Sequence, residues 1–149
     1  MSIEIVPPAG FMQSVKAEIN AYVGNVRTMW LNYLNLIGKE AVNIARSEHK
    51  YLDQTGNLTS SIGYVIVEDG KIIQEGDFTQ VKNGAEGVTE GRALARNAAA
   101  DYPQGYTLIV VAGMKYAAYV EKMKLGGLTA GELHARNRAK EIINQLKML

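Results

Sequence analysis

The feature that most constrains this fold is a regular apolar stripe in the first third of the chain. Between residues 15 and 44, apolar side chains recur at alternating steps of four and three. This spacing puts them on one side of an α-helix. We predict a helical arm over residues 11–50, after an N-terminal extension, residues 1–10, in which Pro7-Pro8 interrupts regular structure. The stripe consists of Val15, Ile19, Tyr22, Val26, Met29, Tyr33, Leu36 or Ile37, Ala41 and Ile44.

The predicted arm is longer than a small domain needs. A continuous helix over these residues would be about 60 Å long, at ~1.5 Å per residue. Gly24 and Gly38 each disfavour a helix interior by about 1 kcal/mol relative to alanine, so either could mark a break into two helices. In both cases, part of the stripe is expected to pack against something outside the monomer.

The clearest strand signal is Asp69-Gly70, which separates two apolar runs over residues 61–68 and 71–78. Asp-Gly is favoured in type I′ turns because both central residues need a positive φ, so the sequence predicts a β-hairpin. Pairing Glu68 with Lys71 and counting outward makes both faces apolar. One face carries Ile62, Tyr64, Ile66 and Ile73, and the other carries Val65, Val67, Ile72 and Phe78.

A third strand is predicted over residues 106–112, which are continuously apolar rather than alternating. Helices can cover one face of this sheet, and the other face is expected to need another layer or another subunit. Residues 88–102 are alanine-rich and weakly helical, and residues 116–123 favour a short helix or a bent strand. Thr129-Ala130-Gly131-Glu132 has the pattern of a capping box. It predicts a last helix whose inward residues are Leu133, Ile142 or Ile143, and Leu146.

These elements predict one α+β domain over residues 1–149, a length at which a chain buries roughly two thirds of its unfolded surface. Residues 51–149 would form the α+β core after the extension and the arm. The core is expected to hold a mainly antiparallel sheet of three or four strands with a β-hairpin. A long N-terminal helix and a C-terminal helix flank it.

Several classes of chemistry find no support in the composition. The chain has no cysteine, which excludes disulfides, thiolate metal sites and a cysteine nucleophile. His49 and His134 each lack a second ligand at helical spacing, so no metal and no cofactor are predicted. No apolar run approaches the ~20 residues of a bilayer span, so no membrane partner is expected. The most basic stretch, residues 134–140, reads as a solvated helix face, and nucleic acid is not an expected partner.

The main alternative to a structural role is a small metal-dependent hydrolase or nuclease that uses the hairpin carboxylates. Cross-strand carboxylates can approach closely enough to share a divalent cation. The predicted register argues against this, because it places Glu68 beside Lys71 and Glu75 opposite Tyr64. The carboxylates concerned are Glu68, Asp69, Glu75 and Asp77.

Two segments resemble the signatures of the tail-completion, or head–tail joining, proteins of long-tailed bacteriophages. They are Leu52-Asp53-Gln54-Thr55-Gly56-Asn57-Leu58-Thr59-Ser60-Ser61-Ile62 and Ala112-Gly113-Met114-Lys115-Tyr116-Ala117-Ala118-Tyr119-Val120-Glu121. In that family, a helix runs into the first signature before a β-hairpin, and a later strand leads into the second before a C-terminal helix. The resemblance covers residues 35–149. The chain departs from the family pattern at residues 122–127, where a proline-containing segment is common, and in its long N-terminal stripe.

The resemblance implies a non-catalytic subunit of a homo-oligomeric ring, often of six copies, between the tail tube and the head connector. Its partners would be itself, the tail-tube protein and the head-connector protein, in a virion assembled in the bacterial host cytoplasm. Thr55-Gly56-Asn57 would set the turn from helix into strand, and Tyr116, Tyr119 and Glu121 would pack and pin the strand-to-helix crossover. The motif residues are Thr55, Gly56, Asn57, Leu58, Ser61, Ile62, Tyr116, Ala117, Tyr119, Val120 and Glu121.

Overall fold

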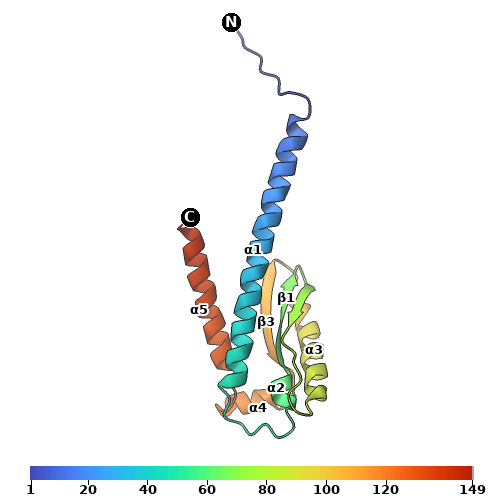
Figure 1. Cartoon of the computed structure of the whole chain (residues 1–149), viewed down its shortest axis with the longest axis vertical. Helices are drawn as coiled ribbons and strands as arrows, with labels where there is room; N and C mark the ends of the chain where they lie inside the picture. Colours follow the sequence, from blue (N-terminus) through green and yellow to red (C-terminus); the bar gives the residue numbers. More distant parts are fainter. Residues whose placement is uncertain (149) are drawn as a thin grey trace. The chain divides into compact units, whose positions relative to one another are not determined.

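The computed structural model describes residues 1–148, which contain five helices and a three-stranded antiparallel sheet (Figure 1). The α+β class, the β-hairpin and the helices near both ends of the chain confirm the predicted fold class. By their internal contacts, residues 1–33 and the residues from 34 onward form two separate units. In chain order, the elements are α1 (Phe11–Ser47), α2 (Asn57–Ser60), β1 (Ile62–Glu68), β2 (Lys71–Gly76), α3 (Ala85–Ala99), β3 (Tyr106–Ala112), α4 (Ala117–Lys122) and α5 (Leu128–Lys147).

Helix α1 continues through both Gly24 and Gly38, so neither glycine breaks it. Its apolar stripe differs between the two units. In residues 1–33 the stripe is exposed, and Ile19, Tyr22, Val23, Val26 and Met29 all belong to the accessible surface. From residue 34 onward the stripe is buried, through Leu34, Ile37, Ala41, Val42 and Ala45.

The sheet has the order β2-β1-β3, with β1 in the middle. Glu68 pairs with Lys71 as predicted, but a β-bulge next to Ile66 shifts the rest of the hairpin register. Glu75 therefore pairs with Val65, and the predicted pairing of Glu75 with Tyr64 is wrong. The prediction assumed an uninterrupted ladder, whereas a bulge inserts one extra residue into one strand without changing the apolar pattern.

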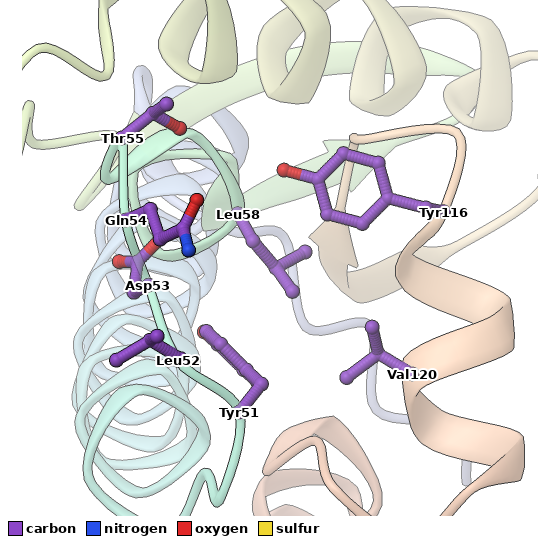
Figure 2. Close-up of a pocket in the computed structure, with 8 residues that line it drawn as sticks. All are labelled: Tyr51, Leu52, Asp53, Gln54, Thr55, Leu58, Tyr116 and Val120. Atoms are coloured by element: carbon purple, nitrogen blue, oxygen red, sulfur yellow. The ribbon is translucent and has the colours of Figure 1, made fainter.

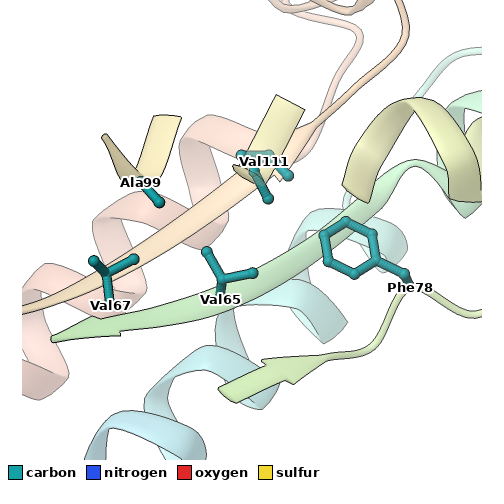
Figure 3. Close-up of a cluster of buried hydrophobic side chains, with 6 residues drawn as sticks. Val65, Val67, Phe78, Ala99 and Val111 are labelled. Atoms are coloured by element: carbon teal, nitrogen blue, oxygen red, sulfur yellow. The ribbon is translucent and has the colours of Figure 1, made fainter. Parts of the chain in front are cut away.

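One face of the sheet packs on α3. Val65 and Val67 of β1 form a buried cluster with Phe78, with Val111 of β3 and with Ala99 of α3 (Figure 3). Ile72 lies against the same cluster, so the four residues predicted for this face, Val65, Val67, Ile72 and Phe78, do lie together.

The other face packs on the C-terminal part of α1, where Tyr64 lies against Gly38 and hydrogen-bonds Asn35. Helices of the same chain thus cover both faces. Of the two predicted alternatives for the second face, another layer or another subunit, the structure has another layer, which the buried part of α1 supplies. Ile73, assigned to this face, is 38% exposed beside the bulge.

Helix α5 approaches α1 closely because glycines face it. A Cβ atom at Gly131 would lie 2.5 Å from the Ala41 carbonyl oxygen, and one at Gly127 would lie 2.3 Å from the Ala45 carbonyl oxygen. These glycines define the inner face of α5. Leu133, which we expected to point inward, is 61% exposed because it lies off that face. Ile142 is buried, as one of the two predicted alternatives required.

Candidate functional site

The two segments that resemble tail-completion signatures come together at the end of the unit where α2 and α4 lie (Figure 1). Between them is an open cavity of about 270 Å³. Leu58 of the first segment and Tyr116 and Val120 of the second point toward its middle (Figure 2). The remaining lining residues are Tyr51, Leu52, Asp53, Gln54 and Thr55.

Gly56 makes the turn into α2 possible. Its φ is 80°, in the left-handed region that glycine adopts without strain, and a Cβ atom there would lie 2.0 Å from the Val81 carbonyl oxygen. Thr55 Oγ1 accepts a hydrogen bond of 3.3 Å from the amide of Asn57, which tightens the same turn. The chain enters β1 through the single turn of α2.

The side chain of Asn57 connects α2 to the first turn of α3. Its Nδ2 donates to Glu86 Oε2 over 3.0 Å, and its Oδ1 accepts from the Gly87 amide over 3.3 Å. The two backbones also touch, because a Cβ atom at Gly87 would lie 1.9 Å from the Asn57 carbonyl oxygen. Asn57 therefore helps to position the helix that covers the sheet. Sequence reasoning placed Asn57 in the turn and missed this contact with α3.

The hydroxyl residues between α2 and β1 are internal. Ser60 and Ser61 are both completely buried. Ser61 Oγ donates to the Leu58 carbonyl over 2.7 Å, and Ser60 Oγ accepts from the Val81 amide over 2.7 Å. Leu58 and Ile62 belong to the buried core as well, so most of the first segment holds the fold together.

Glu121 caps the N-terminus of α5. Its Oε1 accepts from the Leu128 amide over 2.8 Å, and its Oε2 accepts from the Thr129 hydroxyl over 3.0 Å. The predicted capping box is wrong, because Thr129 lies within the first turn and Glu132 pairs with Arg136 at 2.8 Å. A carboxylate from α4 satisfies the free amides instead.

Replacement of Glu121 by alanine should lower the free energy of unfolding by about 1–2 kcal/mol, because the first amides of α5 lose their acceptor. Chemical unfolding in urea measures the change. Glu132→Ala is the matched control, since it removes an exposed i,i+4 pair worth about 0.5 kcal/mol or less. Equal losses for the two variants would contradict the capping role.

The aromatic residues of the second segment remain partly accessible. Tyr116 is 44% and Tyr119 is 64% exposed. Burial raises the pKa of the Tyr116 phenol, and the nearby carboxylates of Asp53 and Glu86 raise it further. Burial also raises the pKa of Tyr51, although its hydrogen bond to Thr59 acts in the opposite direction. The cavity lining therefore combines the phenol groups of Tyr51 and Tyr116 and the carboxylate of Asp53 with apolar side chains such as Leu58 and Val120.

Three of the four hairpin carboxylates, those of Glu68, Asp69 and Glu75, each have a different partner. Glu75 forms an ion pair of 2.6 Å with Arg92, while Asp69 accepts from the Gly105 amide over 2.8 Å. Glu68 accepts from the Tyr106 hydroxyl over 2.6 Å. Within residues 1–148, histidine, aspartate and glutamate side chains form no group of three or more that could hold a metal ion.

The two histidines and the basic stretch lie in ordinary structural contacts. His49 stacks on Tyr51 with ring centroids 4.1 Å apart, and His134 Nε2 lies 2.8 Å from Glu40 Oε2. Arg138 contacts Glu40 and Glu141. None of the helices described in residues 1–148 has both the length and the apolar character needed to cross a membrane.

Comparisons of the chain with protein-family models, curated proteins and solved structures found no significant match. The resemblance to tail-completion proteins therefore rests on the two sequence segments.

Proposed function

We propose that this protein is a non-catalytic structural subunit that assembles with copies of itself into a ring at the head–tail junction of a long-tailed phage. The observation that carries the proposal is the meeting of the two signature segments around one joint. At that joint Gly56 forms the turn, Asn57 positions α3 and Glu121 caps α5. These motif residues hold neighbouring helices and strands in place. That is the role expected of motif residues in a structural, non-catalytic protein.

The exposed stripe of residues 1–33 supports self-assembly. An isolated helix that buries no apolar face is only marginally stable in water. Ile19, Tyr22 and Val23 are each more than half exposed, so this part of α1 would gain stability from a partner surface. Contacts between two different surfaces of identical subunits close into rings when the rotation between neighbours permits it.

Light scattering on a size-exclusion column, over a range of protein concentrations and at two salt strengths, tests the assembly. We expect one discrete oligomer, which electron microscopy should resolve as a closed ring. The variant Ile19→Asp/Val26→Asp should form smaller assemblies, with a lower mass in solution, because the substitutions put charges into the apolar stripe. A strict monomer at every concentration would contradict self-assembly.

The biological setting needs a separate test. Disruption of the gene in the phage genome that carries it should leave heads and tails that form but do not join, and complementation should restore complete particles. The protein should also be detected in purified virions. Complete, infectious particles without the protein would contradict a role at the head–tail junction.

A further inference from the structure

The outer edge of β3 is open and uncharged. In the described part of the sheet, β3 pairs only with β1, so the outward amide and carbonyl groups of residues 107–112 have no neighbouring strand. The opposite edge strand, β2, carries the charged residues Lys71 and Glu75, and its ladder with β1 contains the bulge. Charged side chains and bulges both block the pairing of an edge strand with another chain. Residues 107–112 contain no charge, so β3 has no such protection.

A groove of about 440 Å³ runs beside this edge, within the unit that begins at residue 34. Leu108, Ile109 and Val110 all line it. Successive strand residues point to opposite faces, so three in a row can line one groove only where it follows the strand edge. Across the groove, Ala135 and Ala139 of α5 present small side chains that leave room for larger ones.

The chain also contains an unpaired segment with strand character. Residues 2–6, Ser-Ile-Glu-Ile-Val, have no regular structure, and their side chains alternate between polar and apolar from Ser2 to Ile5 before the apolar Val6. Ile3 is 76% and Ile5 is 88% exposed. In a strand these two isoleucines share one face. Pro7-Pro8 would end the strand, because proline has no amide to donate to a ladder.

Chain lengths favour an exchange between copies. Residues 11–33 are helical and span about 35 Å at ~1.5 Å per residue. From Gly10, the six residues back to Glu4 reach no more than about 20 Å even when fully extended. The segment is therefore shorter than the helical stretch 11–33, which separates it in the chain from the residues that line the groove.

We propose that residues 2–6 of one copy add to the free edge of β3 in the next copy as a fourth strand. Ile3 and Ile5 enter the groove between β3 and α5, and the backbone completes the open edge. Donor and acceptor are different surfaces, so the contact propagates from head to tail and can close a ring. This inference rests on the proposed self-assembly, and it does not depend on the phage setting.

Peptide binding tests the acceptor directly. A labelled peptide of residues 1–8 is titrated into a variant that lacks residues 2–6, and fluorescence anisotropy is measured. We expect saturable binding with one peptide per subunit. An Ile3→Asp/Ile5→Asp peptide should bind at least about tenfold more weakly, because it would place carboxylates against the apolar side chains that make up most of a lining that also includes Glu132 and Arg136. A Glu4→Gln peptide is the matched control and should retain binding.

Disulfide trapping tests whether the donor comes from another copy. Because the chain has no cysteine, two single-cysteine variants give an unambiguous product. A Glu4→Cys protein mixed with a Thr107→Cys protein should form a disulfide-linked pair on mild oxidation. The control mixture uses Gln74→Cys on the β2 edge and should not. A double variant, Glu4→Cys/Thr107→Cys, that closes its disulfide within one chain at high dilution would overturn the exchange.

The outcomes separate this inference from the proposed function. If the full chain assembles but deletion of residues 2–6 changes neither its mass nor its concentration dependence, and the peptide does not bind, strand exchange is wrong and ring assembly stands. If the deletion alone converts the oligomer to monomers and the peptide binds, strand exchange is supported. A full chain that is monomeric at every concentration, with no peptide binding, contradicts both.

Discussion

Replacement of Tyr64 by alanine is expected to lower the free energy of unfolding by about 4 kcal/mol, the range for loss of a large buried aromatic side chain. Tyr64 is 1% exposed, and its ring fills a space between two glycines. A Cβ atom at Gly38 of α1 would lie 2.5 Å from Tyr64 Cδ2, and one at Gly76 of β2 would lie 2.5 Å from Tyr64 Cζ. Alanine would leave a cavity between helix and sheet that neither backbone can close.

Tyr64→Phe separates the ring from its hydroxyl, which donates to Asn35 Oδ1. That variant should lose only about 1 kcal/mol, because Gln74 still donates to the same oxygen over 2.9 Å. Urea unfolding at one fixed protein concentration measures both variants, since self-association would otherwise add to the apparent stability. Similar losses for the two variants would show that the hydroxyl, and not the packed ring, determines the stability.

Alanine substitutions at Gly24 and Gly38 of α1 test the contact between Gly38 and the Tyr64 ring, with Gly24 as the control. Gly24→Ala should raise stability by about 0.5–1 kcal/mol, because no atom lies within 4 Å of the added methyl group and alanine favours the helix. Gly38→Ala should lower stability, by about 1–3 kcal/mol, since the methyl group overlaps the Tyr64 ring. Two changes of the same sign would contradict the proposed fit.

Gly38 shows what the sequence could and could not reveal about the fold. The apolar stripe predicted the helix and the Asp69-Gly70 turn predicted the hairpin, because both signals depend on residues close together in the chain. A glycine inside a helix is locally a weak point, so we considered a break there. Its real neighbour, Tyr64, belongs to a different element. The hairpin bulge was missed for the related reason that it alters pairing without altering apolar periodicity.

In the candidate site, too, features that depend on neighbouring residues could be predicted, and contacts between distant elements could not. The two segments could be found from their residue patterns, and the position of Gly56 at a turn could be expected. The roles of Asn57 and Glu121 could not, because their partners lie in other elements and include the backbone amides of Gly87 and Leu128. Every residue except proline has such an amide, so the sequence holds no signal for the partner. The capping box failed because a helix can take its cap from a neighbouring element.

Replacement of Arg46 by methionine is expected to lower the free energy of unfolding by about 3 kcal/mol. Arg46 Nη2 donates to the Ile62 carbonyl over 2.9 Å, and it also donates to the carbonyls of Asp77 and Thr79. One guanidinium on α1 thus joins the start of β1 to the segment that leaves β2. Methionine keeps most of the apolar volume but removes the two shorter charge-assisted bonds, to Ile62 and Asp77, each worth about 1.5 kcal/mol.

The comparison with Arg46→Lys tests whether stability depends on the planar, forked arrangement of donors in the guanidinium group or only on its charge. Burial lowers the pKa of Arg46 and the carboxylate of Asp77 opposes that shift, so the site holds a charge at some desolvation cost. Lysine retains the charge but is a compact point donor without the rigid geometry of arginine. We expect Arg46→Lys to recover less than half of the stability lost in Arg46→Met. Hydrogen exchange should be fastest in β2 for both variants, because Asp77 adopts a φ of 62° and depends on Arg46 to hold it there. Unchanged protection of β2 would show that the sheet does not need this link to α1.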